Sequence, residues 1–189
     1  MPRTIELIVI HCSASPDGAS LFEGVAGESS FRTPVQFIDA WHAKRGFRRS
    51  SAWRNTLNGS LTSIGYHFLI YTGGAIVTGR HVDEIGAHAH FDGQRSYNQR
   101  SIGVCMIGTE RFAPAQWASL ASLITELRAK YPDASVYGHR DLSPDLDSDG
   151  VVERHEWLKT CPGFDVTAWL ARGMAPLAED VFNHPVGKA

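Results

Sequence analysis

The sequence of 189 residues is poor in cysteine, in net charge and in long apolar runs. Three cysteines cannot all pair with one another, and a chain of this length needs no disulfide framework, so reduced or metal-bound thiols are expected. A net charge of -2 argues against a nucleic-acid-binding protein, which usually carries a basic excess. No apolar run approaches the roughly 20 residues of a membrane span, and no basic segment precedes a long apolar one at the N-terminus. We therefore expect that the protein does not insert into membranes. We also expect that it is made in the cytoplasm without a signal peptide.

A 43% share of hydrophobic residues is enough for one compact domain at this length, and no internal repeat is present. Residues 5–12 are apolar on both faces, which is typical of a central strand covered by helices. The periodicity and the turn residues predict the other elements, with strands at 66–71, 75–80, 102–107 and 135–137 and helices at 34–46, 114–131 and from 165 onward. We expect a single α/β domain whose central mixed β-sheet is flanked by helices.

Two segments interrupt this pattern. Residues 13–33 are rich in Ser, Gly and Ala and are predicted to form a long loop. Residues 44–54 carry five basic side chains and no acid, and a solvated loop or helix end is favoured there over a site for anionic partners.

The histidines and cysteines suggest a metal site. A hydrolytic zinc ion needs about three ligands from His, Cys or carboxylate and one open position for water. His11 and His139 each lie at the end of a predicted strand, and Cys161 precedes a proline. Any one of these residues alone would more often be structural, so the combination and its flanking residues carry the prediction.

Six ordered motifs resemble those of the zinc-dependent N-acetylmuramoyl-L-alanine amidases of the second type, a family that includes phage lysozyme-amidases and peptidoglycan recognition proteins. The motifs are IVIHCSAS (8–15), IGYHFLI (64–70), GAHAHFDG (86–93), YNQRSIGVCMIG (97–108), YGHRDLSP (137–144) and LKTCPGFDV (158–166). The resemblance extends from residue 6 to about residue 170. Together these motifs are far more specific than any one of them.

The resemblance implies a role for individual residues. It makes His11, His139 and Cys161 the zinc ligands, a set whose two imidazoles and thiolate suit Zn²⁺. Tyr66 matches the tyrosine that orients or deprotonates the zinc-bound water, and Lys159 matches a lysine that stabilises the developing oxyanion. Two further residues match positions in the substrate groove, namely His88 and Asn98. The remaining cysteines, Cys12 and Cys105, are interpreted as buried core residues.

An acidic segment separates two of these ligands. His139 and Cys161 are 22 residues apart, a longer link than in the shortest phage members of the family. Residues 145–156 match the calcium-loop pattern, in which carboxylates and one backbone carbonyl bind Ca²⁺ and a glycine makes the sharp turn. The predicted calcium ligands are Asp145, Asp147, Asp149, the carbonyl of Val151, and Glu156. A solvated acidic loop is the alternative, and no EF-hand helix pair flanks the segment, so a structural role for Ca²⁺ is expected.

The resemblance implies a peptidoglycan hydrolase that cleaves the amide bond between N-acetylmuramic acid and L-alanine by a zinc-activated water. We expect residues 1–175 to form the amidase domain, with the calcium-type loop inserted at 145–156, and residues 176–189 to form a peripheral tail. The expected partner is peptidoglycan or a muropeptide, bound by a monomer, and the insertions at 16–33 and 47–62 would reshape the groove.

The leading interpretation is a phage or prophage endolysin that acts on the cell wall after release. The alternatives are a non-catalytic peptidoglycan-binding module, a zinc peptidase, a muropeptide-recycling amidase and a secreted antibacterial effector.

Overall fold

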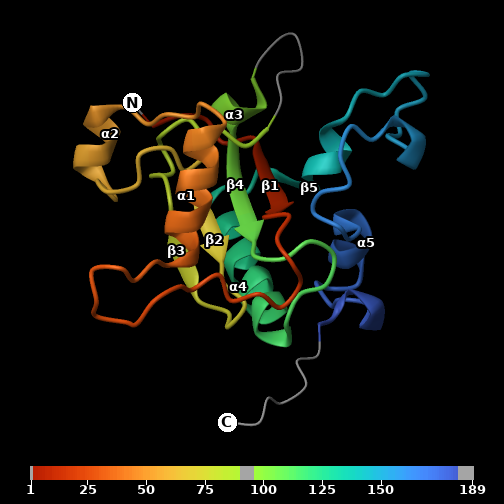
Figure 1. The fold of residues 1–189 in the computed structure, drawn as a ribbon. Helices are drawn as coiled ribbons and strands as arrows, with labels where there is room; N and C mark the ends of the chain where they lie inside the picture. The colour runs from red at the N-terminus through yellow and green to blue at the C-terminus, as the bar shows by residue number, and fades with distance from the viewer. Residues whose placement is uncertain (1, 90–95, 183–189) are drawn as a thin grey trace.

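The protein is built on a five-stranded mixed sheet in the order β3-β2-β4-β1-β5 (Figure 1). A computed structural model describes residues 2–89 and 96–182. Four strands run parallel: β1 (Leu7–Cys12), β2 (Phe68–Ile70), β4 (Ser101–Met106) and β5 (Ser135–Gly138). The edge strand β3 (Ile76–Thr78) is antiparallel to β2. The predicted mixed sheet in a single domain is thus confirmed.

The middle of the sheet explains why two strands are so apolar. All six residues of β1 and all six of β4 are buried, and the two strands pair in parallel from end to end. Parallel strands need crossover segments that place helices on the faces of the sheet, so both faces are covered.

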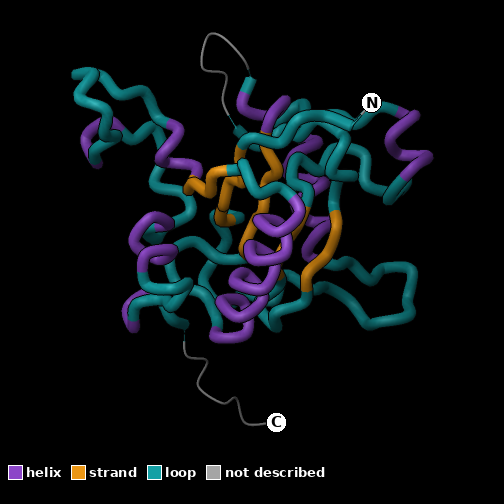
Figure 2. Tube along the Cα trace, turned by 180° about the vertical axis from the view of Figure 1, so that it is seen from behind, coloured by secondary structure: helices purple, strands orange, loops and turns teal. Residues whose placement is uncertain are grey.

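The longer helices lie on opposite faces of the sheet. Helix α1 (Pro34–Lys44) covers one face, and α4 (Pro114–Lys130) crosses the other, as Figures 1 and 2 show from opposite sides. Each begins at a proline, and a glutamine in the first turn accepts a hydrogen bond from the backbone N–H just before it, Gln36 from Thr33 at 2.8 Å and Gln116 from Ala113 at 3.0 Å.

Shorter helical segments join the sheet and the loops. Their bounds are Ser51–Thr56 (α2), Tyr97–Arg100 (α3), Val166–Ala171 (α5), and the 3₁₀ turns His139–Leu142 (η1), Arg154–Glu156 (η2) and Ala178–Asp180 (η3). Within the described residues, no helix combines the length and apolar character that a membrane span requires.

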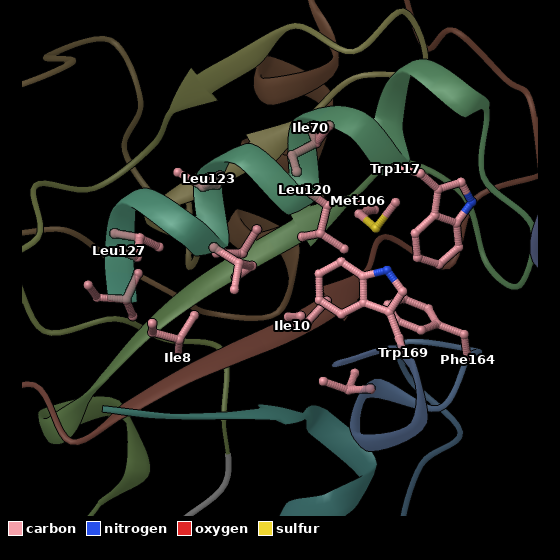
Figure 3. Packing of buried hydrophobic residues seen from close by; sticks show 14 of the residues in the cluster. Ile8, Ile10, Ile70, Met106, Trp117, Leu120, Leu123, Leu127, Phe164 and Trp169 are labelled. Atoms are coloured by element: carbon pink, nitrogen blue, oxygen red, sulfur yellow. The ribbon is translucent and has the colours of Figure 1, made fainter. Parts of the chain in front are cut away.

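Two buried clusters hold the layers together, one on each face of the sheet. Figure 3 shows the cluster under α4, where Leu120 and Trp117 pack over Ile10 of β1 and against Trp169 of α5. The second cluster joins α1, through Val35 and Ile38, to β2 and β4. Burial of each such side chain is worth about 1.5–3 kcal/mol, so these clusters fix the sheet and with it the strand ends.

The predicted elements occur where expected, except for α2 and α3. Helix α2 has no buried residue, so no apolar periodicity marks it in the sequence. It is defined instead by its cap, because the Ser50 side chain accepts a hydrogen bond from the Trp53 N–H at 3.3 Å.

The prediction that residues 44–54 are solvated is wrong at Arg49. The Arg49 side chain is fully buried, and its guanidinium donates to both carboxylate oxygens of Glu84 at 2.8–3.1 Å. The same guanidinium donates to three backbone carbonyls of the segment 57–61. Arg49 therefore fastens this basic segment to the body of the domain.

Two loops project from the body, residues 13–33 and the segment between β5 and α5, and both stand out in Figures 1 and 2. At the C-terminal end, the Phe182 N–H donates to the Phe112 carbonyl at 2.9 Å, and Val181 packs against the core under α4. Of the expected tail, residues 183–189 lie outside the described residues, as do residues 90–93 of the motif at 86–93.

Candidate metal centre

Three donor atoms converge at the carboxyl ends of β1 and β5. His11 is the fifth residue of β1, His139 directly follows β5, and Cys161 comes from the loop before α5. The Nδ1 atoms of His11 and His139 lie 3.1 Å apart, and His11 Nδ1 is 3.8 Å from Cys161 Sγ. All three donor atoms lie within 4.8 Å of one another. The structure therefore brings together the three residues that the sequence singled out as ligands.

The donor set fits a zinc ion. A tetrahedral ion with bonds of about 2.0–2.1 Å to nitrogen and about 2.3 Å to sulfur separates its ligand atoms by about 3.3–3.6 Å, close to the distances between these donors. Burial, aided by the neighbouring His139 and His88, holds the pKa of His11 well below its usual value. The ring is therefore neutral at pH 7 and has a lone pair for a metal.

The sheet explains how donors so distant in sequence meet. Strands β1 and β5 are parallel neighbours, with Ile10 opposite Gly138, so the residues that follow them emerge side by side. Cys161 is fastened to both strand ends: its Sγ accepts a hydrogen bond from the Cys12 N–H at 3.2 Å, and its carbonyl accepts one from the Arg140 N–H at 2.8 Å. The Cys12 N–H contact was not expected, although Cys12 and Cys105 are buried as predicted.

Two of the donor residues, His139 and Cys161, line a hollow of about 510 Å³, and the third, His11, is fully buried beside them. Its other walls come from the end of α1 and the residues that follow it, from residues 87–89, and from the loop 142–161. His42, Arg45 and Phe47 contribute to it and were not among the predicted site residues. His42 could have been found from its spacing, since it follows the buried Ile38 by one helical turn.

Tyr66 stands beside the donors. Its ring centroid lies 5.1 Å from that of His11 and 5.1 Å from that of His42. Burial, together with the thiols of Cys105, Cys161 and Cys12, holds the pKa of Tyr66 well above its usual value. The phenol therefore keeps its proton and acts as a hydrogen-bond donor.

Lys159 lines the same hollow from the solvent side, two residues before Cys161. Its side chain is exposed, and no hydrogen bond or ion pair holds its ammonium group to another residue of the described ranges 2–89 and 96–182. The group is thus available to a ligand in the hollow.

The two residues predicted to contact substrate, His88 and Asn98, line the hollow but are committed to protein partners. His88 is 8% exposed, and its Nδ1 lies 3.0 Å from His11 Nε2. The Asn98 side chain accepts hydrogen bonds from the N–H groups of His88 and Ala89 at 2.8 and 3.0 Å and donates to the Ala89 carbonyl at 2.8 Å. Contact with substrate stays a prediction for both.

The acidic loop is folded around its own backbone. Asp145 accepts hydrogen bonds from the N–H groups of Ser148 and Gly150 at 2.7 and 2.8 Å. Carboxylate oxygens of Asp145, Asp147 and Glu156 lie within 4.8 Å of one another. The predicted ligands Asp145, Asp147 and Glu156 are therefore close enough to share one ion, whereas Asp149 groups with Asp147 and Glu153.

Comparison with known families gives one match that spans most of the chain. The family described as N-acetylmuramoyl-L-alanine amidase matches residues 1–164. The endolysin of Enterobacteria phage T3 is 31% identical over 177 residues, which cover 89% of this chain and 87% of the relative. An uncharacterized protein of Haemophilus influenzae is 48% identical over 105 residues, which cover 51% of this chain and 86% of that protein.

Solved structures share the fold. The N-acetylmuramoyl-L-alanine amidase LysC of Clostridium intestinale aligns with a TM-score of 0.58 at 24% identity, over 90% of this chain and 85% of LysC. The peptidoglycan recognition protein PGRP-LB of Drosophila aligns with a TM-score of 0.54 at 22% identity, over 98% of this chain and 87% of that structure.

Proposed function

The chain belongs to the N-acetylmuramoyl-L-alanine amidase family, and from this premise we propose that its reaction depends on a zinc ion held by His11, His139 and Cys161. The bond cleaved joins the lactyl group of N-acetylmuramic acid to the L-alanine of the stem peptide. The observation that carries the proposal is the convergence of three zinc-type donor atoms, with two of the donor residues, His139 and Cys161, lining one hollow. Zinc bound there would lower the pKa of a coordinated water to about 7 and polarise the scissile carbonyl.

The side chains around the donors supply the rest of the chemistry. Tyr66, protonated and in ring contact with His11, would donate a hydrogen bond that orients the attacking water. The Lys159 ammonium would stabilise the negative charge that grows on the carbonyl oxygen as the tetrahedral intermediate forms. All these groups come from one chain, and we propose that the enzyme acts as a monomer.

A peptidoglycan-binding module without catalysis is the second candidate. A binding module needs the hollow but not the three donors, and the complete set of His11, His139 and Cys161 supports hydrolysis over binding alone.

The biological setting we propose is that of an endolysin. The similarity to the phage T3 endolysin over 89% of this chain supports it. Such an enzyme is made in the cytoplasm and reaches the cell wall on release. A muropeptide-recycling amidase and a secreted antibacterial effector are the alternatives, and a lysis assay on cells producing the protein with and without a phage holin separates them from an endolysin.

Digestion of defined muropeptides, with product identification by mass and zinc measured in the same preparations, tests the reaction. We expect release of stem peptides that begin with L-alanine. Cys161→Ser should lose both zinc and activity. Lys159→Ala and Tyr66→Phe should retain zinc while their kcat falls about 100-fold, because each removes one group that acts in the transition state. Unchanged turnover in all three variants, or cleavage at another bond, would refute the proposal.

We also propose that the loop 145–156 binds Ca²⁺. All the predicted ligand types are present, Asp145 Oδ2 accepts the Gly150 N–H, and Gly150 has the positive φ of 91° that a sharp turn requires. Glu153 occupies the position that often reaches the ion through water and lies near Asp147 and Asp149. The ion would neutralise clustered carboxylates and stiffen the link that ends at Cys161.

Melting curves with and without a calcium-selective chelator test this site. At a calcium concentration 100-fold above the Kd, binding should stabilise the folded state by about 2.7 kcal/mol and raise the Tm accordingly. The variant Asp145→Asn should melt at one temperature in both conditions. Equal melting temperatures for the wild-type protein, with its zinc content unchanged, would exclude the calcium site.

A further inference from the structure

His88 and His11 form a buried pair behind the metal centre. The His11 side chain is 0% exposed and that of His88 8% exposed, and their rings meet edge to face with centroids 4.9 Å apart. His11 Nε2 lies 3.0 Å from His88 Nδ1, on the side of the His11 ring opposite to the Nδ1 that faces His139 and Cys161.

The hydrogen bonds beyond this pair have one consistent direction. The Ser101 Oγ lies 2.6 Å from the Tyr97 carbonyl, which only accepts, so the Ser101 hydroxyl donates there. Its lone pair then accepts from His88 Nε2, 3.4 Å away. A neutral His88 that is protonated at Nε2 has a bare Nδ1, which accepts from His11 Nε2. His11 is thereby left with a bare Nδ1 on the side where the donors converge.

The surroundings of His88 are shaped to hold its ring. A Cβ atom on Gly103 of β4 would lie 2.6 Å from His88 Cδ2, and one on Gly86 would lie 2.5 Å from the same atom, so a side chain at either position would displace the ring. A glycine inside a fully buried strand is unfavourable unless another group approaches closely, and here that group is His88. Asn98 fixes the backbone of the same residue through the His88 N–H.

We propose that His88 is a positioning residue for the zinc ligand His11, holding the tautomer and the ring angle that aim Nδ1 at the metal. Ser101 sets the direction of the hydrogen bonds that run from His11 through His88. Asn98 and the two glycines hold His88 in place. The assignment rests on the proposed zinc site. It differs from the role in substrate contact that the family resemblance implies, because both ring nitrogens of His88 already have protein partners.

Zinc affinity, measured by competition with a chromogenic chelator, is the primary test. Loss of a hydrogen-bond partner behind a ligand weakens metal binding about 10–100-fold, and His88→Leu should show a loss of that size. His88→Asn should retain most of the affinity, because its Oδ1 can accept from His11 Nε2 in place of the imidazole Nδ1. Ser101→Ala should weaken zinc binding by a smaller factor. The matched control is His81→Phe, at a half-exposed histidine that takes no part in these hydrogen bonds.

Imidazole ¹⁵N shifts of the zinc-free protein give a second readout. In the wild-type protein His11 should be a single tautomer with its proton on Nε2, whereas His88→Leu should give a mixture. If His88→Leu does not fold, zinc affinity is compared between two other variants. His88→Asn should retain most of the wild-type affinity, and Ser101→Ala should bind zinc more weakly than the wild-type protein.

The outcomes separate the two proposals. A wild-type protein that binds no zinc overturns the proposed function and this assignment with it. A wild-type protein that binds zinc, together with a His88→Leu variant that has the same zinc affinity and only a raised KM, overturns this assignment alone and makes His88 a substrate contact.

Discussion

Among single residues, two buried histidines outside the donor set have unusual electrostatics. Burial lowers the pKa of His67 to about 3 and that of His42 to about 4, with the cations Arg3 and Arg45 as the next cause in each case. Both rings accept a backbone hydrogen bond at Nδ1, His67 from Gly103 and His42 from Gly65, each at 2.9 Å. A protonated ring would lose this bond, so both are neutral in the folded protein.

These histidines predict acid sensitivity. In the unfolded chain they take up protons near pH 6.5, whereas in the folded protein they do so only near pH 3 to 4. The unfolded state therefore binds more protons as the pH falls through this window, and the free energy of unfolding falls with it. Each ring accounts for up to about 3 kcal/mol between pH 6.5 and 4, at about 1.4 kcal/mol per pKa unit. Urea unfolding at pH 7, 5.5 and 4.5 measures the effect.

The control for this prediction is His67→Asn, whose side-chain oxygen can accept from the Gly103 N–H and does not titrate. Its stability should fall less steeply with acid than that of the wild-type protein. Equal slopes would show that His67 does not carry the effect.

The residues of the site differ in how far the sequence could reveal them. The convergence of His11, His139 and Cys161 was predictable because strand ends and a flanking motif mark these residues. The pairing of His88 with His11 was not, since it joins side chains 77 positions apart whose contact depends on the register of β1 and β4 and on glycines in the wall. The residues next to His11 and His88 in the sequence give no sign of this contact.

At the level of elements, apolar periodicity was the reliable signal. It located β1 and α4, because each buries a long regular stretch against the sheet. It could not locate α2, which buries nothing, nor the four-residue α3. It also could not show that one arginine in the basic segment 44–54 points inward, since a charged side chain is buried only where a distant partner meets it.

The partner of Arg49 is Glu84, and this ion pair gives a prediction about the segment joining α1 to β2. Glu84 is the counter-charge of both Arg49, at 2.8 Å, and Arg80, at 3.3 Å, and all three side chains are at most 5% exposed. Glu84→Gln would leave two buried guanidinium groups without a carboxylate, which costs about 3–5 kcal/mol. Denaturant unfolding measures the loss.

The matched control is Asp83→Asn at the adjacent, half-exposed acid, which should change stability by no more than about 0.5 kcal/mol. A Glu84→Gln variant as stable as Asp83→Asn would show that the buried ion pairs do not hold this segment.

For the whole molecule, the proposed metal centre adds a further link between the ends of β1 and β5 and the loop before α5. Zinc should therefore stabilise the entire domain, by about 4.1 kcal/mol at a free concentration 1,000-fold above its Kd. Calorimetry of the zinc-free and zinc-loaded protein measures the increase in Tm. His139→Ala should lose the increase, whereas Lys159→Ala, which removes no donor atom, should retain it. An equal increase in both variants would place the zinc elsewhere.

The order of the donors along the chain also has a consequence for synthesis. His11 leaves the ribosome early, whereas Cys161 emerges 150 positions later. A nascent chain or an N-terminal fragment that stops before Cys161 carries only two of the three donors. Under the proposed function, such a partial chain lacks one zinc ligand and should not hydrolyse the cell wall until Cys161 has been made.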